Sequence, residues 1–331
     1  MLMSRPCLSI VVPCFNEEQV LPETLRRLYE VLRRLRDADR ITSESRIFFV
    51  DDGSRDRTWP LIVEAVAQGE PVVGVKLSRN RGHQNALLAG LQMADGDAIV
   101  SIDADLQDDV EAIERMLQEF ERGAEVVFGV RSNRDTDTVF KRASADFFYR
   151  LMRFMGAETI DHHADFRLMS RRANEALMQY REVNLYLRGI IPMLGFRTAT
   201  VTYERNVRFA GESKYPLKKM LGLSIDAITS FSTLPLRVIS GMGLVVSTAT
   251  TLLGFWILAR AIFGLQVIPG WASTVLPIYF LGGIQLISIG VIGEYVGKMY
   301  LETKGRPRFF IETICRQTPS IAARETKLPS R

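Results

Sequence analysis

The chain has 331 residues, with 42 lysines and arginines against 38 aspartates and glutamates, which gives a formal net charge of +4 at pH 7. This length allows about two domains of roughly 150 residues each. Much of the small positive excess lies beside apolar segments in the later part of the chain, where it favours anionic lipid headgroups as partners over nucleic acid. Three cysteines, Cys7, Cys14 and Cys315, are an odd number without metal-binding spacing, as expected in a reducing compartment, and we assign them no function.

The first part of the chain alternates strand-like and helix-like segments. Short apolar runs predict strands over 9–12, 46–50, 72–77, 97–102 and 125–130. Apolar residues at helical spacing predict helices over 18–35, 58–68, 83–94 and 109–122, followed by a basic and aromatic helix near 138–155 and a strand over 198–204. Repeated β-α units of this kind predict an α/β fold with a parallel, doubly wound sheet covered by helices.

Three of the predicted strands end in polar or acidic clusters. These clusters are Pro13-Cys14-Phe15-Asn16-Glu17, Asp51-Asp52-Gly53-Ser54 and Asp103-Ala104-Asp105-Leu106-Gln107. Parallel sheets bind ligands at the carboxyl ends of their strands, so the three clusters should lie at one edge. Asp103 and Asp105 alone are equally consistent with an ordinary loop. Together with the other clusters they predict a site where a divalent metal binds a diphosphate.

The chemistry of a departing diphosphate indicates roles for individual residues. Negative charge gathers on the diphosphate as its bond to a sugar breaks, and a metal ion stabilises that charge. We expect Asp105 to bind Mg²⁺ or Mn²⁺ directly, with Asp103 facing the ribose or the same ion. Arg131 ends a neighbouring strand and could contact phosphate oxygens, the alternative being a surface ion pair.

Histidines near these segments are assigned no catalytic role. His83 opens a predicted helix, and we favour a capping or packing role for it over that of a base. His162 and His163 adjoin Asp161 and Asp165, but their spacing matches no standard zinc pattern, so we expect no second metal.

Two later segments, 238–259 and 261–293, contain no charged residue, and each can supply the roughly 20 apolar residues that span a bilayer. Two buried core helices are the alternative, but Gly264, Pro269, Gly270 and Trp271 between the segments favour a transmembrane hairpin. Basic residues flank the pair on the same side: Lys218, Lys219, Arg237, Lys298, Lys304, Arg306 and Arg308. The positive-inside rule then places both termini in the cytoplasm, and the absence of a signal peptide agrees with a large domain that is not exported.

The segment just before the hairpin combines basic and apolar residues. Residues 216–231 predict an amphipathic helix at the membrane interface. Ahead of it, Arg208, Ser213 and Lys214 form a basic cluster that would bring donors to a phosphate at the bilayer surface, or would simply contact lipid headgroups. The end of the chain, from about 316, is polar and predicts disorder.

In their order, these motifs resemble the inverting family-two glycosyltransferases of GT-A fold, specifically the polyprenyl-phosphate hexosyltransferases. The matching segments are Val11-Val12-Pro13 with Asn16-Glu17, Asp51-Asp52-Gly53-Ser54, Asp103-Ala104-Asp105-Leu106-Gln107, Gly129-Val130-Arg131, the Asp165 segment, Gly211-Glu212-Ser213-Lys214-Tyr215 and Gly293-Glu294-Tyr295. Each is modest alone, but their order and spacing are specific and cover most of the chain. Residues 165–172 and 209–220 are most similar to bactoprenol glucosyltransferases of the GtrB type, whereas dolichol-phosphate-mannose synthases usually differ at the Asp165 segment.

The resemblance implies a domain order and a set of binding residues. The implied units are a cytoplasmic GT-A domain over 1–210, an interfacial region over 211–235, two transmembrane helices over 236–298 and a cytoplasmic tail over 299–331. The residues implied to hold the nucleotide base and ribose are Pro13, Phe15, Glu17 and Asp51 or Asp52. Those implied to serve the metal, diphosphate and sugar are Asp103, Ala104, Asp105 and Gln107. A tyrosine is common where this chain has Phe15, so a hydroxyl contact there is absent.

The implied reaction is attack by the phosphate of a polyprenyl phosphate, such as undecaprenyl phosphate, on the anomeric carbon of a nucleotide-activated hexose. Because a phosphate monoester loses its second proton at about pH 6, the nucleophile needs no strong base. Asp165 is the implied catalytic carboxylate, acting as a base or in positioning the acceptor, yet it would repel an anion unless a cation or proton intervenes. A single displacement gives a β-linked product from an α-linked donor.

The resemblance also implies UDP-glucose as donor, a homotetramer in the inner membrane, and a lipid-linked sugar product used to modify cell-surface glycans. N-acetylglucosamine or mannose are the alternative donor sugars. A processive polysaccharide synthase is disfavoured because the chain has no Gln-x-x-Arg-Trp string. A non-catalytic scaffold or lipid-flipping partner is disfavoured because the acidic motifs are intact and the spans lack the ionisable residues of a transport path.

Overall fold

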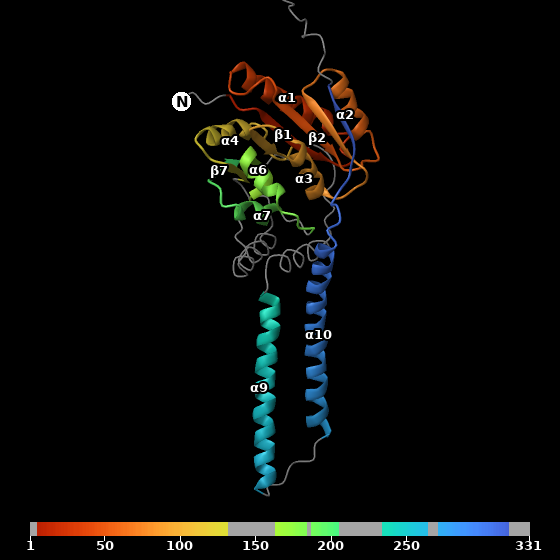
Figure 1. Cartoon of the computed structure of the whole chain (residues 1–331), viewed down its shortest axis with the longest axis vertical. Helices are drawn as coiled ribbons and strands as arrows, with labels where there is room; N and C mark the ends of the chain where they lie inside the picture. Colours follow the sequence, from red (N-terminus) through yellow and green to blue (C-terminus); the bar gives the residue numbers. More distant parts are fainter. Residues whose placement is uncertain (1–4, 132–162, 184–186, 205–233, 264–270, 318–331) are drawn as a thin grey trace, which may run out of the picture.

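The computed structural model describes residues 5–131, 163–183, 187–204, 234–263 and 271–317 (Figure 1). Its strands are β1 (Leu8–Cys14), β2 (Arg46–Asp51), β3 (Val72–Leu77), β4 (Ala98–Ser101), β5 (Val126–Arg131), β6 (His163–Ser170), β7 (Thr198–Tyr203) and β8 (Ile311–Arg316). Its helices are α1 (Leu21–Asp37), α2 (Thr58–Ala67), α3 (His83–Met93), α4 (Ala112–Glu121), α6 (Arg171–Met178), α7 (Leu187–Met193), α9 (Leu234–Ile262) and α10 (Trp271–Thr303). Within these ranges the strands form one eight-stranded sheet in the order β7-β5-β6-β4-β1-β2-β3-β8.

β1 lies near the centre of the sheet, and all seven of its residues are buried. It pairs in parallel with β2 on one side and with β4 on the other. A continuous apolar run of this kind is typical of a strand covered by helices on both faces. The parallel pairing brings the ends of β1, β2 and β4, with the polar clusters that follow them, to the same edge of the sheet.

Helices cover both faces of the sheet and give it two hydrophobic cores. Side chains of α1, α2 and α4 pack in one core, and side chains of α3, α6 and α7 pack in the other. In α1 the buried side chains include Leu21, Leu28, Leu32 and Leu35, which lie on one face at helical spacing. The predicted α/β architecture is therefore confirmed.

α3 packs against the sheet most closely at Gly90. A methyl group on this residue would lie 2.3 Å from Cγ1 of Val11 and 2.7 Å from Cγ2 of Val50. Overpacking of a core by one methyl group costs about 1–3 kcal/mol. We therefore expect Gly90→Ala to lower the free energy of unfolding by this amount and to lower the thermal unfolding midpoint. The exposed substitution Gln92→Ala on the same helix should change the midpoint little, and equal midpoints for both variants would show that α3 can move away without cost.

The sheet is mixed, whereas the sequence pattern predicted a parallel one. β6 runs antiparallel between β4 and β5, and β8 runs antiparallel to β3 at the edge. No strand was predicted at either place. β6 escapes recognition because the buried charged residues Asp165 and Arg167 interrupt its apolar pattern.

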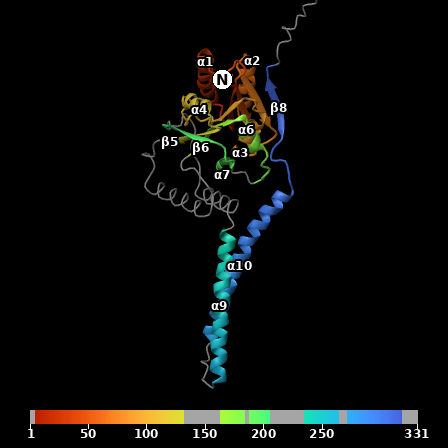
Figure 2. The same ribbon diagram turned by 60° about the vertical axis from the view of Figure 1, so that its left-hand side comes forward.

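After the two long helices the chain returns to the sheet, where β8 pairs with β3 at the edge (Figure 2). The connection before it is also fixed: Glu302, at the end of α10, accepts hydrogen bonds from the backbone N–H of Val183 at 2.8 and 2.9 Å, and Arg308 donates to the carbonyl of Tyr180. Part of the segment assigned to a tail over 299–331 therefore belongs to the folded domain. The polar end predicted to be disordered lies outside the described residues.

α9 and α10 run side by side and project away from the sheet domain (Figure 1; Figure 2). Each contains a segment long and apolar enough to cross a membrane: Pro235–Leu253, with a mean hydropathy of 1.5, and Phe280–Thr303, with a mean hydropathy of 1.4. Neither segment is buried within the chain, which disagrees with the alternative of two core helices. The helices predicted over 138–155 and 216–231 lie outside the described residues.

Candidate active site

The loops that follow β1 and β2 are joined by hydrogen bonds. The backbone N–H of Asn16 donates to Oγ of Ser54 at 3.0 Å, and that of Glu17 donates to Oγ1 of Thr58 at 2.9 Å. Asn16 adopts a left-handed φ of 56°, which turns the chain sharply after the strand. The two loops enclose an open cleft lined by Asn16, Glu17, Glu18, Gln19, Val20, Arg55 and Asp56. Pro13, at the end of β1, is buried, and Phe15 is 43% exposed.

Asp51 and Asp52, which the sequence did not separate, have different environments. Asp52 uses both carboxylate oxygens to accept backbone N–H groups of Arg81 and Gly82, at 2.7 and 2.9 Å, and so fixes the loop before α3. Asp51 accepts one hydrogen bond from the N–H of Ser54, and its buried Oδ2 has no hydrogen-bond partner among the described residues. Burial raises the pKa of both carboxyl groups. Oδ2 of Asp51 is therefore a buried acceptor without a hydrogen-bond donor among the described residues.

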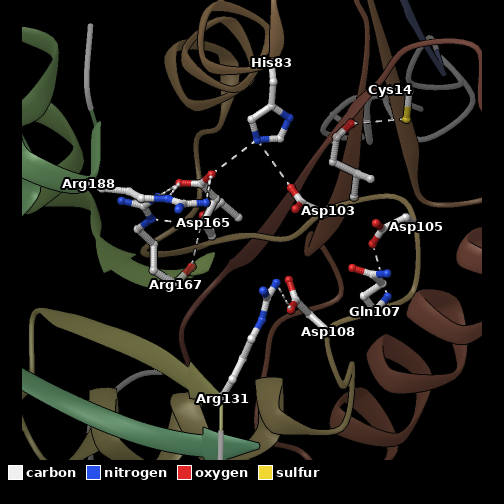
Figure 3. Close-up of polar contacts among 12 residues, drawn as sticks. Cys14, His83, Asp103, Asp105, Gln107, Asp108, Arg131, Asp165, Arg167 and Arg188 are labelled. Carbon is white, nitrogen blue, oxygen red and sulfur yellow. Dashed lines mark hydrogen bonds and ion pairs between the residues drawn. The ribbon is translucent and has the colours of Figure 1, made fainter. Parts of the chain in front are cut away.

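The loop after β4 presents Asp103 and Asp105 (Figure 3). Ala104, between them, is buried and accepts a hydrogen bond from the Thr24 hydroxyl at 2.7 Å, which anchors the loop. Asp105 accepts a hydrogen bond from the N–H of Gln107 at 3.2 Å. Burial raises the pKa of Asp103 to about 6, with His83 opposing the effect. Among the described residues, no group of three or more histidine, cysteine and acidic side chains could hold a metal, so any further ligands would have to come from substrate, water or the remaining residues.

His83 lies in the site, and of the capping or packing role predicted for it the capping alternative is wrong. The N-cap of α3 is Gly82, which has no side chain to cap the helix. Nε2 of His83 is 3.4 Å from Oδ1 of Asp103 and 3.6 Å from Oδ2 of Asp165, so the imidazole lies between the two carboxylates (Figure 3). Burial alone would lower the pKa of His83, but the two carboxylates raise it above its ordinary value.

Asp165 is held by two arginines (Figure 3). Its Oδ1 accepts from Nη2 of Arg167 and from Nε of Arg188 at 3.2 Å, and its Oδ2 accepts from Nη2 of Arg188 at 3.0 Å. Burial would raise the pKa of Asp165, but His83, Arg167 and Arg188 hold it well below its ordinary value. Without a cation nearby, Asp165 would repel an anionic nucleophile. Arg167 and Arg188 each supply such a cation.

Arg131 makes an ion pair with the buried Asp108, while its own side chain is 30% exposed. Nη2 of Arg131 is 3.1 Å from Oδ1 of Asp108, and Nε of Arg131 donates to the Tyr203 hydroxyl at 3.3 Å. The Tyr203 hydroxyl also donates to Oδ1 of Asp108, and burial together with Asp108 raises the pKa of Tyr203. This triad joins β5 and β7 to the loop after β4.

Loss of the Tyr203 hydroxyl from the triad of Arg131, Asp108 and Tyr203 is expected to lower the stability of the fold measurably. Tyr203→Phe removes a donor from Asp108, whose Oδ2 is buried without a partner among the described residues. Leaving a buried carboxylate less satisfied costs about 1–3 kcal/mol. We expect the thermal unfolding midpoint to fall accordingly in Tyr203→Phe, while Tyr29→Phe on α1 changes it little. An unchanged midpoint in Tyr203→Phe would mean that the pair of Asp108 and Arg131 does not need the hydroxyl.

Several predicted residues lie outside the described ranges. These are Arg208, Ser213 and Lys214 of the basic cluster, together with Asp161 and His162. Conversely, sequence reasoning missed Asp108, Arg167, Arg188 and Tyr203. Asp108 directly follows the Asp103 cluster, which was a usable signal. Arg188 stands in no motif, and only its place on α7 beside Asp165 reveals it.

The chain is similar to several known proteins. The model of the family described as "Glycosyl transferase family 2" matches residues 9–178. The uncharacterized glycosyltransferase YkoT of Bacillus subtilis (strain 168) is 49% identical over 94% of this chain and 93% of its own. The bactoprenol glucosyl transferase of Shigella phage SfX is 42% identical over 92% of this chain and 99% of its own. Among solved structures, mannosyl-3-phosphoglycerate synthase from Rubrobacter xylanophilus has a TM-score of 0.47 and 17% identity, over 72% of this chain and 75% of that one.

The family match spans more than half of the chain, and it covers the strand ends that carry Asp51, Asp103 and Asp105. The relatives extend over nearly the whole length, including α9 and α10. On this evidence the chain is a glycosyltransferase of GT-A fold and belongs to glycosyl transferase family 2.

Proposed function

We propose that this protein transfers glucose from UDP-glucose to the phosphate of a polyprenyl lipid, such as undecaprenyl phosphate, at the cytoplasmic face of the membrane. The observation that carries the proposal is the juxtaposition of an acidic and a basic half in one site. Asp103 and Asp105 lie on the loop after β4, and the Asp165 carboxylate with Arg167 and Arg188 lies across His83 from Asp103.

The acidic half suits a nucleotide diphosphate with a divalent cation. Asp105 and Asp103 supply carboxylate oxygens, the donors that Mg²⁺ and Mn²⁺ prefer, and they would hold such an ion. When bound, the ion supplies charge stabilisation to the departing diphosphate. Gln107 is placed by the same loop to contact the sugar or diphosphate. Asp51 has a buried oxygen without a donor among the described residues, and it therefore suits an N–H of the nucleotide base better than Asp52 does.

The basic half suits an anionic acceptor that is already ionised. A phosphate monoester is mostly dianionic at neutral pH, so its oxygen can attack the anomeric carbon without giving up a proton. The new bond joins that oxygen to the anomeric carbon, and the electron pair of the broken bond leaves with UDP. A single displacement of this kind inverts the configuration, so an α-linked donor gives a β-linked lipid product.

The membrane part of the proposal rests on α9 and α10, whose apolar segments are exposed. An acceptor with a long prenyl chain remains in the bilayer, and a hairpin would hold the site at its surface. The basic residues on both flanks favour cytoplasmic termini. The bactoprenol glucosyl transferase name of one relative supports the same acceptor class. A homotetramer and a role in supplying sugar for cell-surface glycans are further parts of the proposal.

The donor sugar is tested by comparing UDP-glucose, UDP-N-acetylglucosamine and GDP-mannose under identical conditions with undecaprenyl phosphate. We expect UDP-glucose to give the highest kcat/KM, and NMR of the lipid product to show a β-anomeric proton. A preference for another donor would replace glucose by that sugar and leave the reaction class unchanged. Failure of all three, with nucleotide still bound, would favour the alternative of a non-catalytic scaffold or lipid-flipping partner.

A further inference from the structure

Asp165 is poorly suited to the role of a general base. Its side chain is 8% exposed, and its two oxygens accept three hydrogen bonds from arginines. A base must accept a proton near the working pH, whereas these contacts hold the pKa of Asp165 well below its ordinary value. The proposed acceptor also has no proton that must be removed. The carboxylate therefore has a different use.

The charges of this cluster leave a net positive balance. Around Asp165 itself, one carboxylate faces two guanidinium groups, which is the local positive balance; Asp103 lies beyond His83 and, among the described residues, forms no ion pair with either arginine. Arg167 is completely buried and cannot reach a substrate. Arg188 is 39% exposed at the side chain, so it is the cation of the pair that a ligand can approach.

The place of Arg188 in the fold matches the direction from which a lipid would arrive. It lies on α7, at the end of the sheet domain nearest to α9 and α10 (Figure 1). The Asp165 carboxylate accepts hydrogen bonds from both Nε and Nη2 of Arg188, and this paired contact fixes the plane and direction of the guanidinium (Figure 3). The first residue of α7 is also held, because the N–H of Leu187 donates to Oε1 of Gln84, next to His83.

We propose that Arg188 binds the phosphate of the acceptor lipid and that Asp165 is a positioning residue which orients Arg188. This rests on the proposed function, and it assigns the acceptor subsite to the surface between α7 and the loop after β4. Arg167 balances the buried charge of Asp165 from within the sheet. His83 then lies between the acceptor subsite and Asp103 on the donor side.

The test separates KM for the acceptor from kcat and from donor use. In detergent micelles with UDP-glucose and undecaprenyl phosphate, Arg188→Ala should raise the acceptor KM by about 10- to 100-fold, the loss expected for one charge-assisted contact. Its KM for UDP-glucose should stay within about twofold of wild type, because the donor binds on the other side of His83. Arg188→Lys should recover part of the acceptor affinity, because it keeps the charge but loses the paired geometry. Arg171→Ala, at an exposed arginine on the preceding helix α6, serves as the matched control and should behave as wild type.

Asp165→Asn distinguishes positioning from base catalysis. If Asp165 acts through Arg188, this variant should also raise the acceptor KM, and the double variant with Arg188→Ala should be no worse than Arg188→Ala alone. A loss confined to kcat, with the acceptor KM unchanged in both single variants, would overturn the inference. Because Arg188→Ala keeps the buried pair of Asp165 and Arg167, it remains informative even if Asp165→Asn fails to fold. An inactive wild type would count against the proposed function, whereas an active wild type with an unaffected Arg188→Ala would count against this inference alone.

Discussion

Asp105→Ala is expected to reduce sugar transfer by about three orders of magnitude, because a cation on the departing diphosphate supplies several kcal/mol of charge stabilisation. Asp105 lies on a loop anchored from beneath by the hydrogen bond of Thr24 to Ala104, so the loop itself should keep its shape. The measurement is the initial rate of lipid-linked glucose formation at saturating UDP-glucose and undecaprenyl phosphate, over a range of Mg²⁺ and Mn²⁺ concentrations.

The matched control for this prediction is Asp95→Asn, an exposed carboxylate outside the site. It should retain wild-type rates and the wild-type metal dependence. Transfer by Asp105→Ala at near wild-type rates would show that Asp105 does not serve the diphosphate. A rate restored by higher metal concentration would instead indicate that Asp105 contributes mainly to metal affinity.

Arg167→Met is expected to have the largest effect on stability. The guanidinium of Arg167 is fully buried in β6 and faces a carboxylate that is itself nearly buried. Removing one partner of a buried ion pair leaves an uncompensated charge and costs about 3–5 kcal/mol, although Arg188 should keep the cost toward the lower end here. The expected result is a large fall in the thermal unfolding midpoint in detergent.

A second variant shows whether the loss of stability comes from the uncompensated charge of Asp165. In the double variant Arg167→Met with Asp165→Leu, both charges are replaced by apolar groups of similar size, which is often neutral for stability. Its unfolding midpoint should therefore recover toward wild type, while its acceptor KM stays high because Arg188 has lost its partner. A double variant less stable than Arg167→Met alone would contradict this explanation.

The sequence predicted the sheet motifs well because the chemistry there is local. Apolar runs such as the one ending at Val12 specify buried strands, and the clusters after them converge because parallel strands end at one edge. The same reasoning could not find β6 or β8. β6 carries Asp165 and Arg167 in its interior, and β8 follows α10 by a few residues and pairs with a strand distant in sequence, so neither shows an uninterrupted local pattern.

The acidic residues of the site were predictable for the same reason, and their partners were not. Asp103 and Asp105 stand together in the chain, whereas Arg188 reaches Asp165 only because α7 packs over the sheet face beside α3. For His83 the sequence predicted a capping or packing role at the start of a helix, yet Gly82 takes the cap position and the imidazole lies between two carboxylates. Contacts between elements far apart in sequence decide such roles.

Metal-dependent transfer of glucose to a polyprenyl phosphate is tested by incubating the purified protein with radiolabelled UDP-glucose, undecaprenyl phosphate and Mg²⁺ or Mn²⁺. The label extracted into organic solvent with the lipid is then measured. We expect formation of a glucolipid that requires both metal and the acceptor phosphate and stops with EDTA. Its rate of formation should fall by about three orders of magnitude in Asp105→Ala. Labelled lipid formed equally well with EDTA, or by Asp105→Ala, would contradict this expectation.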